Sequence, residues 1–262
     1  MSWHRIYTVC KKDIRSSCKQ KGLVISVIIT FVILGILLPI VMDIAGWGGI
    51  CRSRMGKLEV PVRIPGVSRQ YAPLYIVSTY LLTPAVILLP AYLGPMLAGS
   101  SFVGERISQT AEGLIYTPLT KNELVIGKMG ACIVPCLAVS WVTMIFNAVI
   151  IDCFSLPRFH VLMFPNGMSW ITGLLLVPLA SFLMTEAVML VSQHVKTEKA
   201  SRAVSILVSV PLIVLLESQY SAVLLSSKLW LTVIVLIYAG IDVILFLFLT
   251  QNFNKTSFLL KD

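Results

Sequence analysis

The sequence predicts an all-α, polytopic membrane protein with six transmembrane helices in a single domain covering residues 1–262. Of its residues, 57% are hydrophobic and only 13% are charged, and its mean hydropathy is +0.88. A soluble domain would carry about a quarter charged residues. The apolar runs are also continuous and often reach the roughly 20 residues that a helix needs to cross a bilayer. Short alternating segments, which would predict a membrane β-barrel, are missing from the sequence.

The first predicted element is an amphipathic helix over residues 1–21. Apolar residues recur there at helical spacing, with Lys and Arg on the other faces. The apolar positions are Trp3, Ile6, Cys10 and Ile14. This pattern is typical of a helix that lies in the membrane interface. The alternative is a frayed basic tail that serves only to orient the first span.

Six apolar segments follow, and the first contains no charged residue. The second holds four prolines, at positions 73, 84, 90 and 95, which should kink it. Such kinks either shape a cavity or are tolerated by packing against neighbouring helices. The fifth segment is short. The predicted spans cover about 23–42, 72–99, 126–151, 168–193, 203–217 and 229–250.

The distribution of cations predicts a multi-pass protein of the cell membrane with both termini in the cytoplasm. With the N-terminus inside, 14 of the 21 Lys and Arg residues fall on the cytoplasmic side. Five of the remaining cations lie in one outer loop, 43–71, and oppose this assignment. That loop either contacts anionic lipid or an acidic substrate, or is simply solvated. No basic stretch is interleaved with aromatic residues in a soluble domain, so nucleic acid is not an expected partner.

No enzyme motif is found in the sequence, which predicts no catalytic residue, no bound cofactor and no metal site. G-x-x-x-x-G-K-[ST], H-E-x-x-H and G-x-S-x-G are all missing, and the three histidines are scattered. Cys132 and Cys136 could hold a soft metal, but two thiols without a third ligand are more often small packing residues. A disulfide between Cys51 and Cys153 is possible in principle.

Two acidic residues, Glu186 and Asp242, interrupt the fourth and sixth apolar segments. An Asp near the centre of a span costs about 2.5–3.5 kcal/mol, so such residues usually face the interior of a helix bundle. Both segments should run from the outer to the inner side, which places the two carboxyl groups at similar depth. They line a substrate path, relay protons or accept hydrogen bonds from neighbouring helices, and the sequence leaves these alternatives open.

Gly104–Lys128 is the longest stretch whose composition is typical of soluble protein, and it lies between two long apolar runs. Its pattern predicts a short helix, a break and a new helix. Pro118 ends the first helix, since proline cannot donate a backbone hydrogen bond. Thr120 and Glu123 then form a capping box that starts the helix entering the third span. The first helix has one apolar face, suited either to a partner's groove or to the lipid surface. That face consists of Ile107, Ala111, Leu114 and Ile115.

This segment resembles the second cytoplasmic segment of the membrane subunits of ABC-2-type ABC transporters. That segment reads E-R-E-x-G-T-L-E-x-L-L-x-[ST]-P-[LIV]-[ST]-[RK]-x-E-[LI]-x-x-G-K. This chain departs from it at Ile107, Gln109 and Ala111. A shorter likeness runs from Val191 to Ala200, and the six-span layout agrees with the family. The matching positions are Glu105, Arg106, Thr110, Glu112, Leu114, Thr117, Pro118, Leu119, Thr120, Lys121, Glu123, Leu124, Gly127 and Lys128.

The resemblance implies a permease subunit of an ATP-driven exporter. Two such subunits would enclose a path, and each would dock on a separate ATPase subunit that binds ATP and Mg. Residues 105–116 would form the coupling helix that contacts the ATPase. Compact members of this family favour export of drugs, antimicrobial peptides or other amphiphiles. The coupling residues implied are Glu105, Arg106, Ile107, Thr110, Ala111, Glu112, Leu114, Ile115 and Pro118.

Two rival functions remain open at the level of sequence. One is an ion-coupled secondary transporter that uses Glu186 and Asp242 for proton coupling. The other is a membrane scaffold without transport activity. The sequence leaves open the substrate, and whether the second permease subunit is a copy of this chain or a different one.

Overall fold

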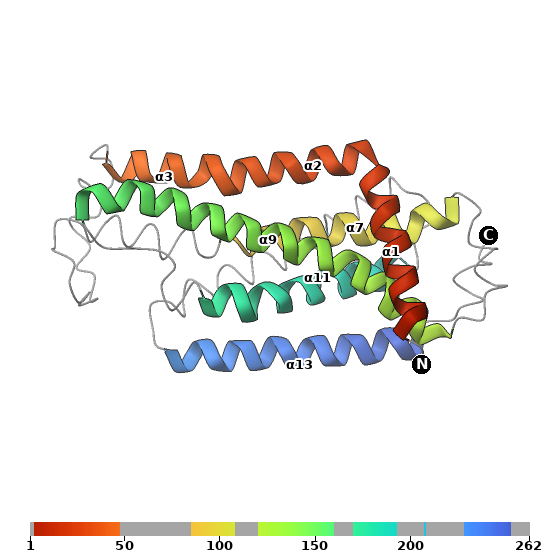
Figure 1. Ribbon diagram of the computed structural model, residues 1–262. Coiled ribbons are helices and arrows are strands. Elements are labelled where there is room, and N and C mark those ends of the chain that lie inside the picture. The colour runs from red at the N-terminus through yellow and green to blue at the C-terminus, as the bar shows by residue number, and fades with distance from the viewer. Residues whose placement is uncertain are drawn as a thin grey trace.

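The computed structural model describes residues 3–47, 85–107, 120–159, 170–192, 207 and 228–252, and all regular secondary structure in these ranges is helical (Figure 1). The prediction of an all-α fold is therefore confirmed for the described residues. The helices are α1 (Trp3–Lys19), α2 (Lys21–Phe31), η1 (Val32–Leu37), α3 (Leu38–Trp47), α7 (Leu88–Ile107), α9 (Lys121–Phe159), η3 (Thr172–Leu176), α11 (Val177–Ser192) and α13 (Lys228–Asn252).

In the described part of the chain, the continuous run α2–η1–α3 lies alongside α7, α9, α11 and α13, and α1 crosses one end of this bundle (Figure 1). Within the described ranges, three stretches are long and apolar enough to span a membrane: Lys21–Val41, Asn122–Phe154 and Thr172–Val191. Leu88–Gly99 and Val235–Gln251 are shorter apolar helices. Apart from residue 207, the predicted fifth span lies outside the described residues, as do residues 72–84 of the second.

The end of α7 and the start of α9 differ from the predicted boundaries. α7 continues eight residues past Gly99, so Glu105, Arg106 and Ile107 belong to its last turns rather than to a separate helix. The rest of the predicted coupling helix, residues 108–116, lies outside the described residues, as do residues 117–119. α9 has 39 residues, or about 58 Å at 1.5 Å per residue, well beyond a hydrocarbon core of about 30 Å. It therefore has to project from a membrane that it spans.

Only two of the four predicted helix-kinking prolines lie in the described region. Pro90 falls in the first turn of α7, where its missing N–H removes no helical hydrogen bond. Pro95 lies inside the helix, which continues past it to Ile107. The neighbouring Gly94 lets α7 approach α11, because a Cβ there would sit 3.4 Å from the Cβ of Met184. Pro95 of α7 therefore lies next to a position where the helix packs closely on α11.

The predicted capping box is confirmed at the start of α9. The Thr120 backbone N–H donates to Glu123 Oε2 at 3.1 Å, and the Glu123 N–H donates to Thr120 Oγ1 at 3.4 Å. The backbone N–H of Leu124 donates to the Thr120 carbonyl at 3.1 Å and begins the helical pattern. Two of the donors that a helix start leaves unpaired are satisfied in this way. The long helix therefore begins at a residue fixed by its own sequence.

We expect Thr120→Ala to destabilise the start of α9 by about 1 kcal/mol, because it removes the acceptor for the Glu123 N–H. Thr120→Ser should keep most of the stability, since a serine hydroxyl caps equally well. Thermal unfolding of the detergent-solubilised protein measures both. Equal melting temperatures for wild type and Thr120→Ala would contradict this role for the cap.

The core of the bundle consists of two apolar clusters. One joins α2, α7, α9, α11 and α13 and includes Leu89, Leu124 and Leu249. The other joins α7, η3, α11 and α13 and includes Val177 and Met184. Many large apolar side chains of α2, α9 and α13 remain exposed on the outside of the bundle. Exposed apolar surface of this extent is expected where lipid or another membrane subunit covers a helix.

Candidate functional site

Helix α1 is confirmed as a helix, but its apolar stripe packs on α9 instead of facing lipid along its whole length. Ile6 is buried, and Val9 and Cys10 lie against Gly127 and Gly130 of α9. Trp3, predicted to share this stripe, is 81% exposed. The spacing predicted the helix correctly, but it could not show that the start of α9 is the surface that α1 covers.

Gly127 allows α1 to pack closely against α9. A Cβ at this position would lie 2.9 Å from Val9 Cγ1 and 3.3 Å from the Ile6 carbonyl oxygen. Real side chains do not tolerate the shorter separation, so Val9 or the helix that carries it would have to shift. Gly127 is one of the positions that match the transporter segment, and in this chain the glycine makes room for α1.

We expect Gly127→Ala to loosen α1 from α9, although alanine is the better helix former. Peptide-resolved alkylation should then modify Cys10 faster than in wild type. Burial, followed by the nearby Asp13 carboxylate, raises the pKa of this thiol, which slows its reaction in the docked helix. Gly240→Ala is the matched control, because no atom lies within 4 Å of a Cβ there. An unchanged Cys10 rate in Gly127→Ala would refute the contact.

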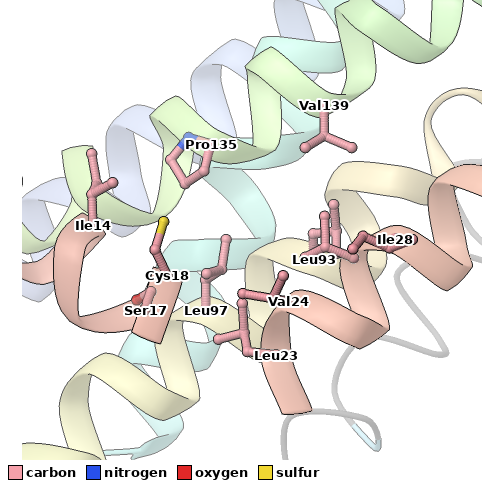
Figure 2. Close-up of a pocket in the computed structure, with 11 residues that line it drawn as sticks. Ile14, Ser17, Cys18, Leu23, Val24, Ile28, Leu93, Leu97, Pro135 and Val139 are labelled. Carbon is pink, nitrogen blue, oxygen red and sulfur yellow. The ribbon is translucent and has the colours of Figure 1, made fainter. Parts of the chain in front are cut away.

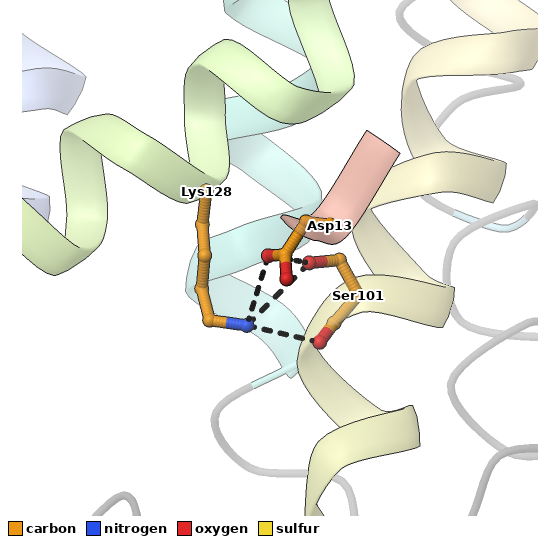
Figure 3. Close-up of polar contacts among 3 residues, drawn as sticks. All are labelled: Asp13, Ser101 and Lys128. Atoms are coloured by element: carbon orange, nitrogen blue, oxygen red, sulfur yellow. Dashed lines mark hydrogen bonds and ion pairs between the residues drawn. The ribbon is translucent and has the colours of Figure 1, made fainter. Parts of the chain in front are cut away.

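A buried polar cluster lies beside this contact and consists of Asp13 of α1, Ser101 of α7 and Lys128 of α9 (Figure 3). Lys128 Nζ lies 3.5 Å from Asp13 Oδ2 and donates to the Ser101 carbonyl oxygen at 3.1 Å. Ser101 Oγ donates to Asp13 Oδ2 at 3.1 Å. The side chains of Lys128 and Asp13 are only 1% and 7% exposed. The ion pair is therefore largely removed from water, and the serine supplies further hydrogen bonds.

The cluster, which we call the inner clamp (Asp13, Ser101 and Lys128), joins the two helices that border residues 108–119. Ser101 lies six residues before the end of α7, and Lys128 lies seven residues after the start of α9. Asp13 brings α1 to the same place. Sequence reasoning matched Lys128 to the family segment but did not predict its partner. The available signal was Asp13, the one acidic residue among the cations of 1–21.

Of the predicted coupling residues, only three lie in a described helix. Glu105, Arg106 and Ile107 form the end of α7. The other six, at positions 110, 111, 112, 114, 115 and 118, lie outside the described residues. The predicted coupling segment is therefore preceded by α7, which Ser101 joins to Lys128. It is followed by α9, whose start is capped by Thr120.

The second candidate site is the pair of acidic residues in the bundle, which we call the carboxyl pair (Glu186 and Asp242). Glu186 of α11 is 1% exposed and Asp242 of α13 is 7% exposed. The two residues lie on helices that pack against each other. Within the described part of the chain, Glu186 Oε2 and both oxygens of Asp242 accept no hydrogen bond. α11 and α13 also run in the same direction, as the sequence predicted (Figure 1).

Several hydroxyl groups on α9 and α11 are engaged with their own helices. Thr185 Oγ1 donates to the Ser181 carbonyl at 2.8 Å, and Ser181 Oγ donates to the Pro178 carbonyl at 2.7 Å. On α9, Ser140 and Thr143 donate in the same way to residues one turn earlier. These donors are thereby directed to backbone carbonyls of their own turns. The carboxyl pair therefore keeps acceptor atoms that are buried without a hydrogen-bond donor among the described residues, a costly arrangement.

Asn147 of α9 is a buried polar residue that the sequence did not single out. Its side chain is 2% exposed, and its Oδ1 accepts no hydrogen bond from the described residues. A lone Asn inside a long apolar run was the signal that could have found it.

The cysteines in the described region are free thiols. Cys132 and Cys136 are buried in the first core cluster, where they pack among apolar side chains. Cys153 is exposed, and Cys51, its predicted possible partner, lies outside the described residues. Among the described residues, no three potential ligands gather to hold a metal ion.

Comparisons with family models, with curated proteins and with solved structures find no match to this chain.

Proposed function

We propose that this chain is the permease subunit of an ATP-driven ABC exporter, which moves a drug, antimicrobial peptide or other amphiphile with energy from a separate ATPase subunit. The proposal depends chiefly on one observation. The segment that resembles the family's coupling region, Gly104–Lys128, connects α7 and α9, and the inner clamp holds both of these helices to α1. A second permease subunit, either a copy or a different chain, would complete the path.

The inner clamp supports this function because a coupling segment has to transmit its movement to the membrane helices. A movement of the ATPase that displaces residues 108–119 would be transmitted to α7 and α9, which Ser101 and Lys128 join. Through its ion pair with Lys128, Asp13 would transmit the same movement to α1. Packed helices joined by a buried ion pair move together more readily than helices joined by a mobile loop.

The carboxyl pair favours a second candidate function, an ion-coupled secondary transporter. Buried carboxyl oxygens without donors require a proton, a cation or a polar group of a substrate to complete their interactions. In the exporter, the same atoms would contact a cationic or hydrogen-bond-donating part of the cargo. The two functions thus assign the pair different ligands, and they differ in whether an ATPase is needed.

Co-purification from the native membrane tests the proposal. We expect an ATP-binding subunit to be isolated with the tagged chain and to be lost with Glu112→Lys, which reverses a charge in the predicted coupling helix. Glu217→Lys makes the same change on the side predicted to be outer and should retain the subunit. Transport that needs no ATP and is abolished by Asp242→Asn would instead establish the secondary transporter and overturn the exporter.

A further inference from the structure

A groove lies where α1 turns into α2, bounded also by α7 and α9 (Figure 2). Its volume is about 230 Å³, and no polar atom contributes to its accessible lining. α1 supplies Cys18 to the wall, α2 supplies Val24 and Ile28, α7 supplies Leu97, and α9 supplies Pro135 and Val139. Four helices therefore form a wholly apolar concave surface at the junction between the crossing helix and the bundle.

The chain at the groove is basic. Lys19 directly follows Cys18, and Lys21 lies two residues before Leu23, another residue of the lining. Both lysine side chains are exposed, and within the described part of the chain neither forms an ion pair. A tight turn at Gln20 separates them, in which the Gln20 N–H donates to the Ser17 carbonyl at 3.1 Å. The turn thus places two exposed lysines next in the chain to residues of the apolar wall.

We propose that this groove binds an anionic phospholipid, with an acyl chain along α2 and α9 and the phosphate near Lys19 and Lys21. An apolar wall next to exposed cations matches the two chemical parts of such a lipid. The groove also lies at the start of the Lys21–Val41 span, where the headgroup region should meet the hydrocarbon core. Lysine side chains at such a boundary extend toward the phosphates.

The basic turn favours a phospholipid over a neutral apolar occupant. A zwitterionic lipid would fill the wall equally well but would gain less from the two cations. A helix of another protein is disfavoured because a volume of about 230 Å³ is too small to hold one. The site depends only on α1, α2, α7 and α9. It would exist whether the chain is an ABC exporter, an ion-coupled transporter or a scaffold.

Native mass spectrometry of the full chain, with added phosphatidylglycerol or phosphatidylcholine, tests the site. We expect phosphatidylglycerol to remain bound with at least tenfold preference. Val139→Phe, which fills the groove, should abolish this binding, and Val142→Phe on the exposed face of the same helix should not. Replacing both Lys19 and Lys21 by Gln should remove the preference and leave weak binding of either lipid. The control Lys11→Gln removes a cation elsewhere on α1, over the ring of Tyr7, and should keep the preference for phosphatidylglycerol.

Alkylation of Cys18 gives an independent readout in the wild-type protein. Its thiol is exposed and lines the groove, so a bound acyl chain should slow its modification by about fivefold or more when phosphatidylglycerol is added. Cys153, exposed on α9 outside the groove, is the internal standard. Equal binding of the two lipids, unchanged binding in Val139→Phe, or a Cys18 rate insensitive to lipid would each overturn the proposal. Loss of the ATPase partner would leave all three readouts unaffected.

Discussion

Lys128→Met should lower the free energy of unfolding by about 3–5 kcal/mol, the largest stability loss we expect from any single substitution in the chain. The substitution removes the cation and leaves the Asp13 carboxylate 7% exposed, with Ser101 as its remaining donor. A buried charge that loses its partner keeps its full desolvation cost. Reversible unfolding in mixed micelles measures the change, and size-exclusion chromatography reports the folded fraction.

A double substitution separates lost charge pairing from lost packing. Asp13→Asn combined with Lys128→Met leaves no unpaired charge, so the double variant should be more stable than Lys128→Met alone. The coupling energy of the pair is the stability change in the double variant minus the sum of the changes in Asp13→Asn and Lys128→Met, each measured singly. Lys11→Met, at an exposed position of α1, should be nearly neutral. Additive losses from the two single substitutions would show that Asp13 and Lys128 contribute independently and that the inner clamp is not a unit.

Glu186→Met and Asp242→Leu should change stability and transport in opposite directions. Each replaces a buried carboxyl group that has oxygens without a hydrogen-bond donor among the described residues, so the free energy of unfolding should rise by about 1–3 kcal/mol. Transport should fall by about tenfold or more, the effect of about 1.4 kcal/mol on a rate. Residues retained at a cost in stability are commonly those on which function depends.

The control for these variants is Ser181→Ala, on the same helix as Glu186. Its hydroxyl is buried and donates to its own helix, so the substitution should leave transport close to that of wild type. A stability loss in Glu186→Met and Asp242→Leu would identify the carboxyl pair as structural hydrogen-bond acceptors. Unchanged transport in both would exclude them from the path in either proposed function.

The sequence by itself determined the features that depend on local chemistry. The all-α class follows from the hydropathy and continuity of the apolar runs. The start of α9 follows from Thr120 and Glu123, whose side chains and backbone amides lie within one turn of each other. α1 follows from its helical spacing, and the burial of Glu186 and Asp242 follows from the cost of a carboxyl group in lipid. Each of these predictions needed only neighbours in the chain or the nature of the solvent.

The tertiary structure alone decided which of these elements meet. The inner clamp joins residues 88 and 27 positions apart, and no periodicity links Asp13 to Ser101 or Ser101 to Lys128. The need for glycine at position 127 depends on Val9 lying over it, and the apolar groove depends on four helices converging at one turn. Contacts between distant segments depend on the path of the whole chain and on packing. For that reason the same sequence that fixed the helix start at Thr120 gave no indication of the partner of Lys128.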